Sequence, residues 1–177
     1  MKQNLYLLGL FTVSGAMFFA HPTSAQTDEI RERVNRRILI SCTATIPSTP
    51  DRAAALVLGT DAVPYIIEAF NNGPPEVQVA AVEVSARRRL ESIRGMMDAG
   101  ATFGLAPADL QRLRDISLED YVGNAVSDFV FAFGGAALGV ASEVGGPDLE
   151  GLLRRVADDE TSIHAATAAE LLGRGGI

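Results

Sequence analysis

Apolar residues return every three or four positions along most of the chain after residue 28, which is the spacing of an amphipathic helix. Ile30, Val34 and Ile38 form the first such stripe, with arginines and acidic residues between them. Clusters of glycine, proline, asparagine and aspartate separate the periodic segments, and no segment alternates apolar and polar residues as a half-buried strand does. The pattern predicts an all-α protein whose first helix covers about residues 28–43.

The next part of the chain predicts a short helix and then a helical hairpin. Two prolines in 46–50 end the first helix, and residues 51–58 are expected to form a short helix that ends at Gly59. A buried stripe with i, i+3, i+4, i+7 spacing follows, and the segment 71–75 stops it. A longer helix then begins near Pro75 and continues to about Met97. The residues expected to face the interior of this hairpin, at about 61–97, are Val63, Ile66, Ile67 and Phe70, and then Val77, Ala80, Ala81 and Val84.

The same arrangement returns near the C-terminus at a fixed offset of 86 positions. No gap is needed across the turn, which favours a repeated helix-turn-helix unit over two unrelated amphipathic helices. A second hairpin is therefore expected at about 147–174. The residues that match the first copy are Leu149, Leu152, Leu153 and Val156 in the first helix, and Ile163, Ala166 and Thr167 in the second.

These segments resemble the HEAT-like helical repeats of bacterial proteins, in which a helix with aliphatic anchors is followed by an acidic turn and an alanine-rich helix. The stretches that carry the resemblance are 63–70 with 76–83, and 149–156 with 165–173. A middle copy fits poorly, because Asp120 and Gly123 fall where apolar and alanine residues belong. We therefore expect an irregular helical domain with HEAT-like hairpins. The resemblance implies a non-enzymatic scaffold or adaptor that binds another protein.

The first 25 residues have the pattern of a signal peptide. Lys2 gives a positive start, residues 5–20 are nearly all apolar, and the segment 23–25 ends in the small residues that a signal peptidase cuts. We expect cleavage after Ala25 and a single exported domain of residues 26–177, in the periplasm or the medium. Cys42 is the sole cysteine, so the chain forms no intrachain disulfide. We interpret Cys42 as a small buried apolar residue.

The segment 129–141 is the most apolar part of the mature chain. Ser117 and Asp120 form a capping pair at the start of the helix that leads into it. Its 13 residues are fewer than the roughly 20 that span a bilayer. We favour a helix that is buried on all sides in the core and broken at Gly134 and Gly135. In the alternative interpretation, Gly135 and Gly139 allow close helix approach in a homo-oligomer or at a membrane.

Charge and titratable residues limit the functions that the sequence supports. Lys2 is the only lysine, so the mature chain carries 14 arginines against 22 acidic residues, which disfavours nucleic acid and anionic lipid as main partners. His164 is the only histidine after residue 25, which excludes a zinc site built from several histidines. We expect His164 at the surface or at a helix start. An acid pair such as Glu119 with Asp128 has no positive support, so no catalytic residue, cofactor or metal is assigned.

The candidate residues for binding a protein partner lie mainly on the long helix of the first hairpin. Glu83 and Glu91 are each four positions from Arg87 and are expected to pair with it, which favours a solvated, self-neutralised face. If this face binds a partner instead, exposed residues of the long helix and of the turn before it provide the contacts. These candidates are Asn71, Asn72, Arg87, Arg88, Glu91 and Arg94.

Overall fold

The computed structural model describes residues 24–43 and 58–175, and every regular element within these residues is a helix. This confirms the prediction of an all-α protein. The expected signal peptide up to residue 23 and the expected helix at 51–57 lie outside the described residues. In chain order the elements are α1 (Ser24–Thr43), the 3-10 helix η1 (Thr60–Ala62), α3 (Val63–Asn72), α4 (Glu76–Asp98), α5 (Pro107–Asp115), α6 (Leu118–Val144), α7 (Pro147–Asp158) and α8 (Ala165–Gly175).

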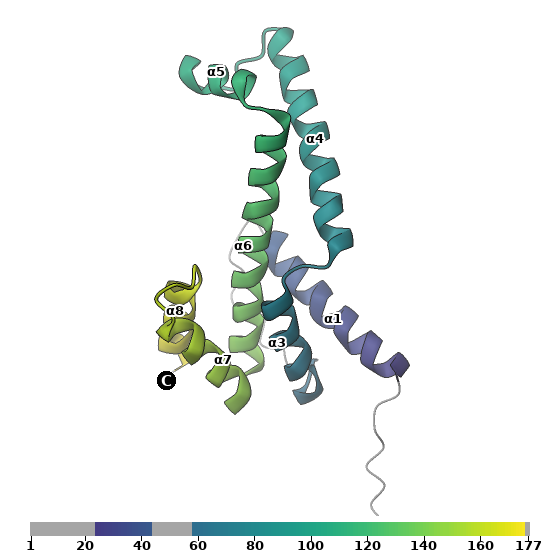
Figure 1. The fold of residues 1–177 in the computed structure, drawn as a ribbon, viewed down its shortest axis with the longest axis vertical. Coiled ribbons are helices and arrows are strands. Elements are labelled where there is room, and N and C mark those ends of the chain that lie inside the picture. Colours follow the sequence, from purple (N-terminus) through teal and green to yellow (C-terminus); the bar gives the residue numbers. More distant parts are fainter. Residues whose placement is uncertain (1–23, 44–57, 176–177) are drawn as a thin grey trace, which may run out of the picture.

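Helix α6 runs through the middle of the molecule and contacts most of the other helices (Figure 1). Its start is capped as the sequence predicts, since the Ser117 hydroxyl accepts a hydrogen bond from the Asp120 amide at 2.9 Å. Gly145 ends it in the left-handed region, with φ of 72°. At 1.5 Å per residue, its 27 residues extend for about 40 Å.

The predicted break in the apolar segment is wrong, because α6 continues through Gly134 and Gly135. A glycine inside a helix costs about 1 kcal/mol relative to alanine. Burial of neighbouring side chains offsets this cost, since Phe133 and Leu138 are fully buried. The expectation of burial on all sides is also wrong, because the Phe131 side chain is 49% exposed. The segment is therefore a one-sided core helix.

Helices α1, α3, α7 and α8 surround the C-terminal half of α6 and form the body of the molecule (Figure 1). The three stripes predicted at 30–38, 63–70 and 149–156 contribute to its core. In α7 all four stripe residues are buried, whereas in α3 only Ile66 is buried and the other three are half-buried. The largest fully buried side chains are Phe133, Ile38, Ile66, Leu90, Leu138 and Leu149.

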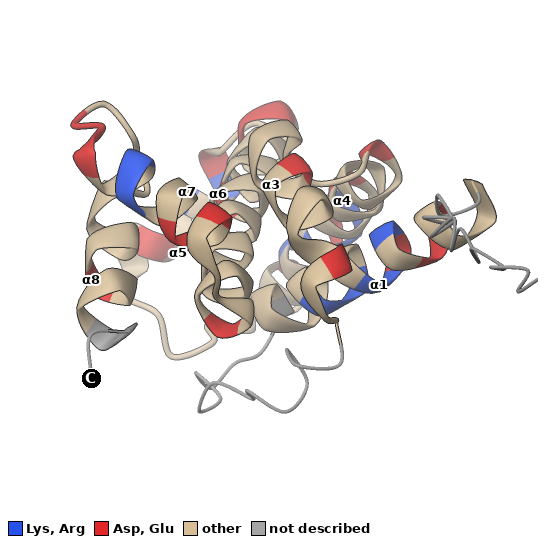
Figure 2. Cartoon of the chain, turned by 90° about the horizontal axis from the view of Figure 1, so that it is seen from below, with Lys and Arg blue, Asp and Glu red and all other residues tan. Residues whose placement is uncertain are grey.

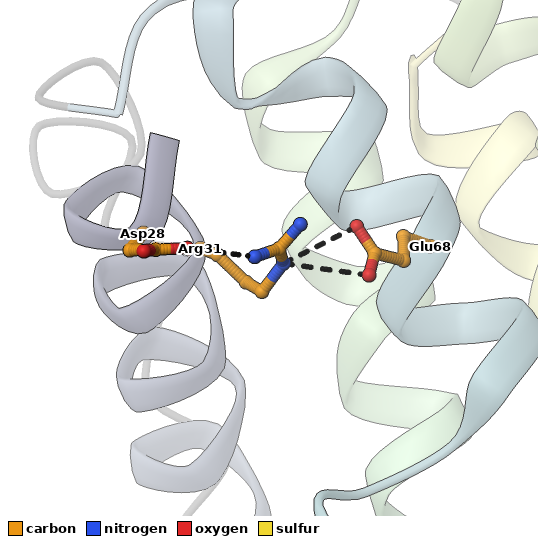
Figure 3. A network of polar contacts seen from close by, with 3 residues as sticks. All are labelled: Asp28, Arg31 and Glu68. Carbon is orange, nitrogen blue, oxygen red and sulfur yellow. Dashed lines mark hydrogen bonds and ion pairs between the residues drawn. The ribbon is translucent and has the colours of Figure 1, made fainter. Parts of the chain in front are cut away.

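An arginine network joins the N-terminal half of α1 to α3 (Figure 3). The Arg31 Nη1 atom lies 3.1 Å from an Asp28 carboxylate oxygen, and its Nε atom lies 3.4 Å from the Glu68 carboxylate. The guanidinium carbon is also 5.3 Å from the centre of the Tyr65 ring. Because the Arg31 and Glu68 side chains are well exposed, this network adds little to stability.

A second ion pair joins α1 to α6 in a much drier environment. Arg37 Nη2 lies 2.9 Å from the Glu143 carboxylate, and both side chains are only 15% exposed. The Arg37 Nε atom is buried without a hydrogen-bond partner. Removing one member of such a pair leaves a buried charge unpaired, which costs about 3–5 kcal/mol. This pair fixes the position of α1 on the body.

The N-terminal half of α6 extends beyond the body together with α4 and α5, and we call these three segments the arm (Figure 1). Helix α4 packs along α6 through Ala86, Leu90 and Met97. Helix α5 is fastened to α4 by Arg94. The Arg94 Nη2 atom donates hydrogen bonds to the carbonyl oxygens of Arg114, at 3.0 Å, and of Ile116, and Nε donates to Leu113 O at 3.4 Å.

The first predicted hairpin does not form as a packed pair. Helices α3 and α4 do not lie along each other, and α4 packs on α6 instead (Figure 1). Two consecutive prolines in the connection favour extended backbone before each of them, which carries the chain away from α3. Val77, expected to face inward, is 71% exposed. The C-terminal helices α7 and α8 do pack against each other.

Helix α6 is the one helix within the described ranges that is long and apolar enough to cross a membrane. The sequence analysis considered only 129–141 and found it too short, whereas the whole helix reaches the necessary length. Core helices of folded proteins pass the same test. Helices α1, α3, α4, α7 and α8 pack on α6, but only 28% of its most apolar window is buried by them.

Candidate functional site

A groove lies where α1, α4 and α6 meet, and Figure 1 shows these helices at the junction of the arm and the body. Its main part is a hollow of about 640 Å³. A second hollow of about 450 Å³ continues from it along α1 toward the start of α4, and the two share Arg36, Leu39 and Gln78. Apolar residues that line the main hollow are Leu39, Ile40, Ala81, Val82, Ala86 and Phe129.

Two of the most exposed large apolar side chains in the molecule line this groove. Ile40 is 55% exposed in the main hollow, and Val77 is 71% exposed in its continuation. Single exposed apolar residues are common on protein surfaces, but apolar residues gathered in a hollow indicate a binding site. The exposure of Val77, which contradicts the expected hairpin, therefore adds to the groove.

Three charged side chains, Arg36, Arg89 and Asp128, line the main hollow together with its apolar residues. Arg36 is neutralised by Glu32 of the same helix, at 2.7 Å. Arg89 makes no ion pair or side-chain hydrogen bond with any described residue, and Asp128 lies on the α6 side. Apolar residues accompanied by a few charged ones are common in surfaces that bind protein.

The groove uses a different face of α4 from the one that the sequence analysis selected. The lining residues Gln78, Val82, Ala86 and Arg89 recur every three or four positions and so share one face. Arg87, Arg88 and Glu91 are exposed on other faces. A helical pattern that counts the small and polar residues of α4 would have identified the face that lines the groove. The pattern of large apolar residues alone could not.

The remaining partner candidates have separate positions. Asn71 and Asn72 are exposed at the end of α3 and do not line the groove. Arg94 is occupied in holding α5. The expected pairing of Arg87 with Glu83 or Glu91 is not formed, since no ion pair joins them within the described ranges. Arg87 is therefore a solvated charge and not part of a self-neutralised face.

The two glycines selected for self-association are half-buried on α6 and have open space beside them. A Cβ atom added to Gly135 or Gly139 would meet no atom within 4 Å. Neither glycine supports a close helix contact inside the described part of the chain. Gly134 does, because an added Cβ would lie 2.3 Å from His164 Nε2.

His164 directly precedes α8, as the sequence predicts, but it is not at the surface, since only 7% of it is exposed. Its ring stacks on Phe131 with centroids 5.0 Å apart, and it meets the edge of Phe70 at 5.9 Å. The Nδ1 atom is buried without a hydrogen-bond partner. Desolvation by burial lowers the pKa of His164 below its ordinary value. The structure makes His164 a core residue packed on Gly134.

The other candidates for chemistry are not assembled into a site. Glu119 and Asp128 are nine positions apart on α6, which places them on opposite faces and roughly 13 Å apart along the axis. Among the described residues, no three histidine, cysteine or acidic side chains gather to hold a metal ion. Cys42 packs half-buried against the core, and desolvation raises the pKa of its thiol to about 11.

Comparison of the chain with models of protein families, with curated proteins and with solved structures found no match.

Proposed function

We propose that this chain is an exported, non-enzymatic helical adaptor that binds another protein in the groove between α1, α4 and α6. The observation that carries the proposal is the apolar hollow of about 640 Å³ between three helices, with Ile40 exposed inside it. Export is inferred from the pattern of residues 1–25. The packed α7 and α8 pair is compatible with one HEAT-like hairpin in the body.

The shape and chemistry of the groove favour an amphipathic helix as its occupant. The groove consists of two adjoining hollows, its walls are helices, and apolar residues make up much of the lining of the main hollow. A partner helix can place an apolar stripe in such a groove at i, i+3, i+4 and i+7 spacing. Acidic residues beside the stripe would meet Arg89, which has no ion-pair partner among the described side chains.

A bulky residue in the groove should prevent partner binding without changing the fold. Ala81 is exposed and lines the main hollow, whereas its neighbour Ala80 is exposed and lies outside it. We expect Ala81→Trp to reduce capture of the partner at least tenfold, because the indole fills the hollow, and Ala80→Trp to leave capture unchanged. The measurement is crosslinking of the tagged chain in its exported fraction, followed by mass spectrometry. Equal capture by both variants would contradict the groove as the binding site.

The alternative function is self-association or membrane contact through the segment 129–141. The exposure of Val130 and Phe131, at 41% and 49%, and the length and hydropathy of α6 favour it. Carbonate extraction of membranes tests the membrane contact. A chain with α6 inserted stays in the pellet, whereas an adaptor is released.

A further inference from the structure

His164 is a buried titratable residue at the point where α8 meets the body. Only 7% of it is exposed, and its Nδ1 atom is buried without a hydrogen-bond partner. The ring stacks on Phe131 of α6, meets the edge of Phe70 of α3, and faces Gly134 of α6 with its Nε2 atom. Most buried polar groups in folded proteins have a hydrogen-bond partner, so a buried histidine whose Nδ1 has none requires an explanation.

Helix α8 is attached to α6 chiefly through its N-terminal end. His164 and Ala168 are the buried residues within 164–173, whereas Leu171 and Leu172 further along the helix are half-buried. These two leucines line a hollow of about 660 Å³ that lies between α6, α7 and α8, and Ala141 of α6 lines it from the other side. The hollow reduces the contact between α6 and the second half of α8. The attachment of α8 to α6 therefore depends mainly on His164 and Ala168.

Protonation gives the His164 ring a charge and a hydrogen that no neighbour accepts. A neutral imidazole carries a hydrogen on one nitrogen only, so Nδ1 can remain bare, but an imidazolium carries a hydrogen on both nitrogens. Phe131 attracts a cation only weakly and supplies no hydrogen-bond acceptor. Burial disfavours the charged form, which lowers the pKa of His164 below its ordinary value of 6.5. The ring therefore binds a proton more readily in water than in its place against α6.

The charged side chains around the ring do not compensate an imidazolium. Those that lie near its contacts are exposed, except for Glu68, so water and salt screen them, and Glu68 itself pairs with Arg31. Within the described residues, none of them forms an ion pair or hydrogen bond with the ring. These side chains are Glu68 on α3, Asp128 on α6, Arg155 and Asp158 on α7, Asp159 and Glu160 in the turn before the ring, and Glu170 on α8.

We infer that His164 is a pH-operated latch for α8: protonation of its imidazole in mild acid releases α8 from α6 and uncovers the face of α6 that carries Gly134 and Ala141. Histidine is the residue whose charge changes in this pH range. Phe131, Gly134, Leu138 and Ala141 recur every three or four positions and so share one face of α6. Phe131 is already half exposed, so release of α8 enlarges an exposed apolar face. None of these residues lines the groove, so the latch does not depend on the proposed function.

Amide hydrogen exchange of the full chain at about pH 7.5 and about pH 5 tests the latch, with labelling times adjusted for the effect of pH on intrinsic exchange. Helix α7 is the internal reference, because its four stripe residues are buried in the core. On acidification, we expect protection of residues 165–175 to fall at least about fivefold and protection of residues 149–156 to change less than about twofold. Unchanged protection of α8, or equal losses in α7 and α8, would overturn the inference.

Two variants and the midpoint of the loss assign the effect to the imidazole. His164→Gln has no group that binds a proton in this range, so protection of its α8 should be the same at both pH values. Glu160→Gln removes an exposed acid of the preceding turn and should respond to acid as the original chain does. In the original chain, the midpoint should lie below 6.5 and above the carboxylate pKa values of about 4. A midpoint near 4, or a full acid response in His164→Gln, would assign the release to carboxylates and overturn the latch.

Discussion

At the scale of single residues, Gly134 is the one glycine among those described for which a side chain has no room, because His164 lies against it. The sequence predicted a helix break at Gly134 and placed His164 at the surface or at a helix start, because neither residue type reveals its neighbour. In the structure, the imidazole edge occupies the space that a Cβ at Gly134 would need. Phe70 and Phe131 hold the ring in place. A pair contact of this kind depends on the packing of α6 against α8 and cannot be read from local pattern.

Substitution of the two adjacent glycines should have opposite effects on stability. Gly134→Ala places a Cβ 2.3 Å from His164 Nε2, and we expect the free energy of unfolding to fall by about 1–3 kcal/mol. Gly135→Ala meets no atom within 4 Å, and we expect a gain of about 0.5–1 kcal/mol from helix propensity. Urea unfolding measures both changes.

A further variant separates this contact from a general glycine effect. In a chain that already carries His164→Ala, the clash is absent. Gly134→Ala should therefore cost less stability in that background than in the original chain. Equal costs in the two backgrounds would show that Gly134 does not act through His164.

Burial of His164 should make stability depend on pH. The folded chain holds the pKa of His164 below its ordinary value of 6.5 because the ring is desolvated. As the pH falls through 6.5, the unfolded chain binds a proton that the folded chain excludes, so the free energy of unfolding decreases. The contribution of neutral His164 to the free energy of unfolding is complete at pH values above the pKa of the unfolded chain. As the pH falls below that value, the contribution decreases by at most about 1.4 kcal/mol per pH unit until the pKa of the folded chain is reached.

The measurement is urea unfolding at about pH 7.5 and about pH 5.5 for the original chain and for His164→Gln. We expect the original chain to lose more stability between the two pH values than the variant does. Equal losses of stability in the two chains would contradict the assignment of this pH dependence to His164, since the acidic residues are common to both chains.

At the scale of elements, most of the described helices could be predicted from the sequence, α5 excepted, but their partners could not. The pattern placed α4 at about 75–97, and the structure has Glu76–Asp98. The same pattern predicted that α4 folds back on α3, because Val77 and Val84 were taken as its buried face. In the structure the buried face of α4 consists of Ala86, Leu90 and Met97. An alanine-rich helix has several faces of similar polarity, so its sequence does not select one.

Helix α5 depends on one side chain for its position. Arg94 donates hydrogen bonds to backbone carbonyls of Leu113, Arg114 and Ile116 at the end of this helix. We expect Arg94→Ala to increase amide hydrogen exchange in residues 107–115 about tenfold or more while thermal unfolding of the body changes little, because α5 contributes no buried residue. Arg88→Ala, an exposed residue without an ion pair, is the matched control. Unchanged exchange in both variants would show that other contacts hold α5.

At the scale of the whole molecule, the all-α class and the apolar stripes of α1, α3 and α7 followed from periodicity, and the division into body and arm did not. Periodicity reports which residues prefer to be buried, but it does not report which helix buries them. The offset of 86 positions led to two equal hairpins, of which only α7 with α8 packs as a pair. The groove arises from the division into body and arm, so the sequence alone could not locate it.

The continuity of α6 also has a mechanical consequence. One unbroken helix of 27 residues joins the body to the end of the arm, so no hinge separates the two ends. A hinge would let the distance between them vary, whereas an α-helix resists stretching because every turn is closed by hydrogen bonds. The molecule therefore behaves as a rigid spacer, and whatever is held at one end stands at a fixed height of a few nanometres from whatever is held at the other.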